Sequence, residues 1–90
     1  MNLIVLPRNS SSGIATVRHA LQEASDVHLV VYNIHGQRVR TLVNLHRQAG
    51  YHSVTWNGRD DAGRPAASGV YLVRMEAAEF VAVRRMVLVK

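Results

Sequence analysis

The first candidate site in this 90-residue sequence is a pair of adjacent carboxylates, which could bind a cation. Asp60 and Asp61 stand in a glycine-rich stretch that could form a calcium loop. Such a loop needs further oxygen ligands at alternating positions, and Asn57 is the best side chain available nearby. We therefore expect Asp60 to accept hydrogen bonds from loop amides and to organise a turn.

Five histidines raise the separate question of a metal site: His19, His28, His35, His46 and His52. None has the His-x-His spacing or the helical i, i+4 spacing that metal ligands commonly use. His28 and His52 fall on expected strands and could face each other across a sheet, but an exposed polar position is the simpler expectation. We predict neither a bound metal nor a cofactor.

The serines and acids do not form a recognisable catalytic pattern. Ser10, Ser11, Ser12 and Ser68 lack the Gly-x-Ser-x-Gly elbow of an activated nucleophile. Phosphate loops and dinucleotide fingerprints are absent from the sequence. A paired-acid glycosidase site would need two opposed carboxylates in a cleft. We expect no catalytic residue and no enzyme activity.

The charge balance narrows the classes of partner. Ten arginines and one lysine oppose six acidic residues, which gives a net charge of +5 with neutral histidines. This balance favours anionic partners, although scattered arginines are also typical of a simple solubility margin. We expect no nucleic-acid binding, because the aromatic residues fall on different strands and most are needed for the core: Tyr32, Tyr51, Trp56, Tyr71 and Phe80.

The elements that must position these side chains are short strands. Alternation and β-branched content predict seven of them, at roughly 2–6, 14–21, 26–33, 38–44, 51–56, 69–76 and 79–89. Two stretches, 14–22 and 38–46, could compete as helices, but neither holds an apolar stripe of helical period. Within 51–56 we expect Val54 and Trp56 to point inward, with Trp56 as the largest core side chain.

Glycine-containing turns separate these strands. Gly36 and Gly50 can each take a positive φ and close a hairpin. The longer stretch 57–69 is typical of a tightly turned loop, and we expect it to carry the chain from one sheet to the other. These features predict an all-β fold, an immunoglobulin-like or fibronectin type III-like antiparallel β-sandwich of about seven strands.

A single domain is the expected organisation for this length. Residues 1–13 would form an N-terminal strand and a flexible lead-in, and residues 14–90 the sandwich. The apolar content of 48% supports a core, and without cysteine packing alone must hold it. We expect any export signal to lie upstream of Met1, because residues 1–7 have no basic start and too short an apolar stretch.

Three stretches carry a resemblance to a known family: Trp-Asn-Gly-Arg-Asp-Asp-Ala-Gly at 56–63, Ser-Gly-Val-Tyr at 68–71 and Met-Val-Leu-Val-Lys at 86–90. With the sequence around them, from Glu23 to Lys90, they resemble the C-terminal sorting domains of the type IX secretion system. The Ig-like domain of the flagellar hook-capping protein is closely related to these.

The resemblance implies a sorting module of a larger exported protein that is secreted or held at the cell surface. Its implied partners are the outer-membrane secretion machinery and anionic lipopolysaccharide. The implied recognition residues are Arg84, Arg85, Met86, Val87, Leu88, Val89 and Lys90. The implied structural loop comprises Trp56, Asn57, Gly58, Asp60, Asp61, Gly63, Gly69 and Tyr71. A last strand at a sheet edge could be recognised by strand addition, and exposed edges would also allow a dimer.

The sequence departs from the family pattern in three places. Residues 7–13 lack the second proline and the aromatic of the usual opening, and Gln22 stands where a proline is usual. Ala77 and Ala78 replace a glycine in the final turn, where a positive φ would cost roughly 1 kcal/mol.

Two alternative functions stay open beside sorting. A structural Ig-like module of the hook-cap type would lie inside a protein that does not use the Sec route. A polysaccharide-binding accessory domain would need an exposed platform of aromatic side chains, which the sequence alone does not locate.

Overall fold

The computed structural model describes residues 2–7 and 15–89, so Lys90 and the expected lead-in at 9–13 lie outside the described residues. Both segments that could have competed as helices are strands. The strands are β1 (Asn2–Pro7), β2 (Ala15–Leu21), β3 (Ser25–Asn33), β4 (Arg38–Arg47), β5 (Gly50–Trp56), β6 (Gly69–Ala77) and β7 (Phe80–Leu88). No helix long and apolar enough to cross a membrane occurs among these residues.

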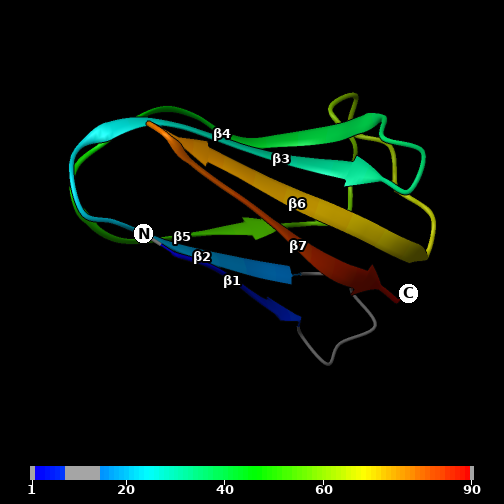
Figure 1. Ribbon diagram of the computed structural model, residues 1–90. Coiled ribbons are helices and arrows are strands. Elements are labelled where there is room, and N and C mark those ends of the chain that lie inside the picture. The colour runs from blue at the N-terminus through cyan, green and yellow to red at the C-terminus, as the bar shows by residue number, and fades with distance from the viewer. Residues whose placement is uncertain (1, 8–14, 90) are drawn as a thin grey trace.

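The strands form two antiparallel sheets that face each other, as Figure 1 shows. The first sheet has three strands in the order β1-β2-β5, and the second has four in the order β4-β3-β6-β7. The predicted seven-stranded sandwich is therefore confirmed. β1 pairs with β2 along its whole length, so the N-terminal strand is an integral part of the first sheet.

Alternation along β3 explains why this sequence forms a sandwich. Val27, Leu29 and Val31 are fully buried, because successive side chains of a strand point to opposite faces. Leu29 lies opposite Met75 of β6, which is also fully buried. A one-residue slip in this register would turn the whole apolar set toward water. The pairing of β3 with its neighbours is therefore fixed by the core.

Trp56 ends β5 and is the largest fully buried side chain of the core, at 1% exposed. Val54 on the same face is only partly buried, although it packs against the core as expected. Burying a large apolar side chain contributes about 1.5–3 kcal/mol, and more for an aromatic ring. Trp56 therefore anchors the end of β5 from which the long loop departs.

The chain crosses between the sheets three times. The loop after Trp56 leads from β5 in the first sheet to β6 in the second, which confirms its expected course. Gly36, at φ 78°, closes the β3–β4 hairpin, also as expected. Gly50 has the expected positive φ, at 127°, but the hairpin expected there is wrong: β4 and β5 belong to different sheets, so the turn before Gly50 is a crossing.

Candidate functional site

The last strand, β7, lies at the edge of the four-stranded sheet and pairs only with β6. Met86 and Leu88 are buried in the core, whereas Val87 and Val89 are exposed. The prediction that Met86 and Leu88 are buried is thus confirmed. β1 packs close to β7 where the two sheets meet. The accessible part of β7 is therefore its outer face, because β1 obstructs the strand addition expected at its edge.

The outer face of β7 is unusually apolar for a surface facing water. Val81, Val83 and Val87 are each about half exposed, and Val70 of β6 lies directly opposite Val87. A strand of an antiparallel sheet with one wet face normally alternates apolar and polar residues. β7 instead carries apolar residues on both faces, a pattern typical of strands that are covered on both sides.

Two adjacent arginines interrupt this apolar strand near its middle. Arg84 and Arg85 are exposed and point to opposite faces of the sheet, since neighbouring residues of a strand alternate. The Nη1 of Arg84 donates to the carbonyl of Val83 at 2.9 Å. Within residues 2–7 and 15–89, neither arginine forms an ion pair. Both charges are therefore available to an anionic partner.

The same arginines weigh against a dimer through paired β7 strands. Arg84 is the central residue of Phe80–Leu88, so symmetric antiparallel pairing would set it against its own counterpart. Like charges opposite each other in a sheet are destabilising. The opposite edge of this sheet, β4, is occupied by the loop described next.

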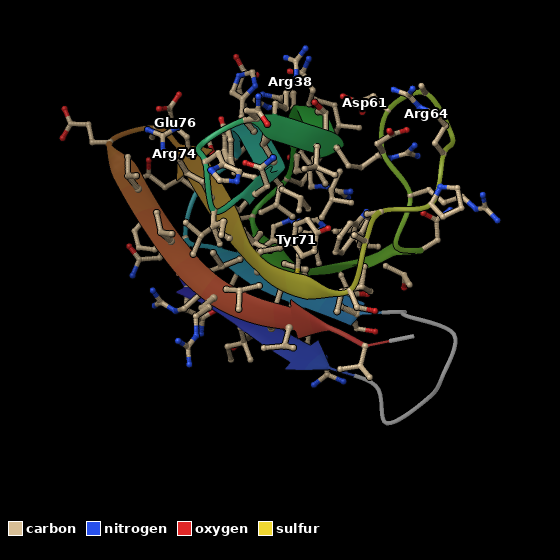
Figure 2. All side chains as sticks on the ribbon, turned by 90° about the vertical axis from the view of Figure 1, so that its right-hand side faces the viewer. Arg38, Asp61, Arg64, Tyr71, Arg74 and Glu76 are labelled. Atoms are coloured by element: carbon tan, nitrogen blue, oxygen red, sulfur yellow. The ribbon has the colours of Figure 1, made fainter. Side chains whose placement is uncertain are left out.

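The loop between β5 and β6 covers the first part of the free edge of β4. The N–H of Asp61 donates to the carbonyl of Val39 at 2.9 Å, and the Asp61 carboxylate accepts from the N–H of Thr41 at 3.0 Å. Arg40 donates to the carbonyl of Asp60 at 3.1 Å. Figure 2 shows Asp61 beside Arg38 at this end of the molecule. The loop thus protects backbone groups that would otherwise be an open template for pairing.

Asp60 organises the interior of the loop. Its carboxylate accepts hydrogen bonds from the N–H groups of Ala62 and Arg64, both at 2.9 Å. These bonds, the one from Arg64 foremost, lower the pKa of Asp60 below its ordinary value of 3.8. Gly63, at φ 83°, closes the tight turn that the carboxylate spans. Asp60 therefore acts as a turn-forming residue.

Trp56 and Tyr71 fasten the two ends of the loop. The indole Nε1 donates to the carbonyl of Arg59 at 2.9 Å, and the Tyr71 hydroxyl donates to the carbonyl of Ala67 at 2.6 Å. The two rings meet edge to face with centroids 5.1 Å apart. Buried Gly58, at φ 75°, follows the Trp56 strand, and Gly69 begins β6. Asn57 also forms a local turn, in which its side-chain oxygen accepts from the N–H of Arg59 at 3.1 Å.

The histidines follow the expected exposure only in part: His28, His35 and His46 are exposed, but His19 is buried. His28 and His52 lie in different sheets, so they do not face each other across one sheet. His19 instead stacks on His52 with ring centroids 5.5 Å apart. His19 is 1% exposed rather than on the surface, because it takes an inward position of β2 between Val17 and Leu21.

The buried imidazole of His19 is held neutral. Burial, followed by the nearby Arg47 and His52, lowers its pKa to about 4. Neither ring nitrogen has a hydrogen-bond partner among the described residues. No group of three or more histidines and carboxylates in this part of the chain is placed to hold a metal ion. His19 therefore acts as an inert core side chain at neutral pH.

Tyr51 is a surface residue, and so an exception among the aromatic residues, most of which were expected in the core. Its ring is 91% exposed on the outer face of the three-stranded sheet, not in the core. A signal for this position exists in the sequence. His52, Val54 and Trp56 share the inner face of β5, so Tyr51 must share the outer face with Ser53 and Thr55.

Comparison with known proteins gives one family and a common fold. The family model described as the FlgD Ig-like domain matches residues 7–79. The structure is similar to that of FlgD from P. aeruginosa, with a TM-score of 0.68 and 18% identity over 96% of this chain and 72% of that one. Among curated proteins, none matches the chain significantly.

A second similar structure is that of PorZ, an essential bacterial surface component of the type-IX secretion system of the human oral-microbiomic Porphyromonas gingivalis. The TM-score is 0.64 and the identity 21%, over 98% of this chain and 11% of PorZ. The chain therefore corresponds to a small part of PorZ. At these identities both likenesses show the fold alone.

Proposed function

The chain belongs to the family of FlgD Ig-like domains, and from this premise we propose that it is a non-catalytic module that sorts a larger exported protein to the cell surface. The family match confirms the resemblance to the Ig-like domain of the flagellar hook-capping protein. The sorting side rests on the residues of β7.

The single observation that carries the proposal is the outer face of β7. It combines half-exposed valines with Arg85, while Arg84 is exposed on the opposite face, and neither arginine has an ion-pair partner in the described residues. Interfaces are typically enriched in arginine and in apolar groups at their centre. A receptor in the outer-membrane secretion machinery that offers a partly acidic, partly apolar surface would fit this face. In this proposal Arg84–Lys90 is the recognition segment, and anionic lipopolysaccharide is the attachment partner.

The test is an export assay that leaves the core intact. Deleting residues 86–90 would remove Met86 and Leu88 from the core, so loss of export would not separate misfolding from lost recognition. The double variant Arg84→Gln/Arg85→Gln instead changes only exposed side chains. It should be compared, in a bacterium with a type IX system, with Arg38→Gln/Arg64→Gln, which removes the same charge from exposed positions outside β7.

We expect a reporter carrying the β7 variant to accumulate in the periplasm. The reporter with the control variant should reach the surface as the unchanged chain does. Circular dichroism of both purified variants would establish that they fold alike. Equal surface display of the two variants would overturn the sorting proposal.

A structural role of the hook-cap type is the second candidate. The family match runs from residue 7 to residue 79, one residue before β7 begins, so the shared features are the five strands β2 to β6 and the loop that caps β4. If the module serves assembly, the β7 variant should leave export unchanged. Removing the whole module should then impair assembly of the parent protein, which electron microscopy or co-purification of its partners would show.

A further inference from the structure

The outer face of the three-stranded sheet carries one large exposed aromatic ring. Tyr51 lies on the edge strand β5 and pairs across the sheet with Ala20, which in turn pairs with Asn2 of β1. Because the neighbouring side chain is as small as alanine, nothing from β2 covers the ring. The ring is thus a free flat surface on the layer opposite β7.

Two shallow hollows border this ring, and both include Tyr51 and Asn2. One has a volume of about 400 Å³ and is lined on this face also by Ile4, Arg18 and Ser53. The other has a volume of about 320 Å³ and extends to Gln22 beyond the end of β2. Each is close in size to the lower range of small-ligand sites. The two hollows share Tyr51 and Asn2, and together they form one depression that spans the three strands.

The residues that line the two hollows supply apolar surface, hydrogen-bonding groups and a positive charge. Tyr51 and the half-exposed Ile4 supply apolar surface, while Asn2, Ser53 and Gln22 supply amide and hydroxyl groups for hydrogen bonds. Among residues 2–7 and 15–89, Arg18 is the only arginine, lysine, aspartate or glutamate that lines either hollow. A ligand for this surface therefore has a flat apolar face, a rim of hydroxyl groups and a negative charge.

We propose that this depression binds an anionic sugar unit, such as a uronic acid residue of a polysaccharide. The C–H groups on one face of a hexose ring stack on an aromatic side chain, and its hydroxyl groups bond to the polar rim. Arg18 pairs with the acidic substituent, for which its planar guanidinium is well suited. The site lies on the other layer of the sandwich from β7 and does not depend on the proposed sorting role.

Single-stranded nucleic acid fits the depression less well, although it is also anionic. Such binders offer several aromatic rings for successive bases and a basic groove along the backbone. On the outer face the depression offers the ring of Tyr51 and the guanidinium of Arg18, whereas the imidazoles of His19 and His52, which also line the first hollow, belong to the inner face of the sheet. A single sugar ring needs no more than this, so the saccharide is the occupant favoured by the lining.

The experiment is a binding titration of the isolated chain with hexagalacturonate, followed by NMR chemical-shift changes. Neutral maltohexaose and polyglutamate are the matched probes for the sugar and the charge. Tyr51→Ala should weaken hexagalacturonate binding about tenfold, and Tyr51→Phe should preserve it because the stacking face remains. Arg18→Gln should also weaken binding, whereas the charge-matched control Arg38→Gln should not.

We expect the chemical-shift changes on binding to be confined to residues of β1, β2 and β5. Three results would overturn the proposal. The first is unchanged binding by Tyr51→Ala, the second is equal weakening by Arg18→Gln and Arg38→Gln, and the third is equal affinity for hexagalacturonate and either matched probe. Because Tyr51 and Arg18 are exposed, all variants should remain folded, which the spectrum of each would show directly.

Discussion

The carboxylate of Asp61 accepts a hydrogen bond from the backbone N–H of Thr41 at 3.0 Å, although 20 residues separate the two in the chain. Next to it, the N–H of Asp61 donates to the carbonyl of Val39. These two bonds take the place of a neighbouring strand along part of the free edge of β4. The long loop is therefore a cover for the sheet as well as a connection between sheets.

Removing the Asp61 carboxylate should weaken this cover. We expect Asp61→Ala to lower the free energy of unfolding by about 1 kcal/mol, since the Thr41 N–H loses its acceptor. Asp61→Asn keeps an acceptor oxygen and should cost less. Urea denaturation at pH 7 measures both. Asp26→Ala is the control, because the Asp26 carboxylate pairs with exposed His46 and an exposed pair contributes little. Equal losses for Asp61→Ala and Asp26→Ala would contradict the role of the loop as an edge cover.

Buried His19 should make the fold sensitive to mild acid. Its pKa is about 4 in the folded chain and 6.5 ordinarily, so the unfolded chain binds the proton more readily. The stability gained from the neutral ring is complete above pH 6.5 and is lost as the pH falls toward 4. The shift corresponds to about 3 kcal/mol at the lower end of this range. Urea midpoints measured between pH 7.5 and 4 should therefore fall steeply.

His19→Leu separates this effect from other acid titrations. The variant has no proton to gain at this position, so its stability should stay nearly level between pH 7 and pH 4.5. Asp60 has a lowered pKa, so its contribution is lost only as the pH falls below 3.8, and that loss should remain in the variant. A fall of equal size in His19→Leu between pH 6.5 and 4.5 would rule out His19 as the cause.

The fold could be predicted from the sequence because alternation and packing act together. Val27, Leu29 and Val31 mark one face of β3 in the sequence, and the same three are buried in the structure. The turn role of Asp60 could also be inferred, since Asp-Gly-rich stretches favour local side-chain to backbone bonds. These features depend on residues close together in the chain.

Features that depend on pairing between distant strands could not be predicted in the same way. His19 and His52 are stacked because β2 and β5 are neighbours, which only the topology decides. The free edge that Asp61 covers likewise exists only once β4 is known to be an edge strand. The exposure of Tyr51 could be inferred from the sequence, because His52, Val54 and Trp56 share the inner face of β5. The hollows beside Tyr51 could not be inferred, because residues of three separate strands form them.

The Tyr71 hydroxyl ties the end of the loop to β6, and its removal should be measurable. It donates to the carbonyl of Ala67 at 2.6 Å while the ring packs against Trp56. Tyr71→Phe keeps the ring and should destabilise the fold by about 1 kcal/mol, as thermal unfolding followed by Trp56 fluorescence would show. Tyr32→Phe is the matched control, because Tyr32 is half-buried on the outer side of β3. An equal change in both variants would mean that the Ala67 bond contributes nothing specific.

The final turn contains a strained residue whose replacement should stabilise the chain. Ala78 has φ 53°, the left-handed region that glycine enters freely and alanine enters at a cost. Ala78→Gly removes that cost, partly offset by the greater freedom of glycine in the unfolded chain, and should gain about 0.5–1 kcal/mol. The side chain is exposed, so no packing is lost. Ala77→Gly is the opposite case, since Ala77 is buried with an ordinary φ, and it should destabilise the chain. Chemical denaturation measures the free energy of unfolding. If Ala78→Gly is less stable than the unchanged chain, the turn between β6 and β7 is not strained at Ala78.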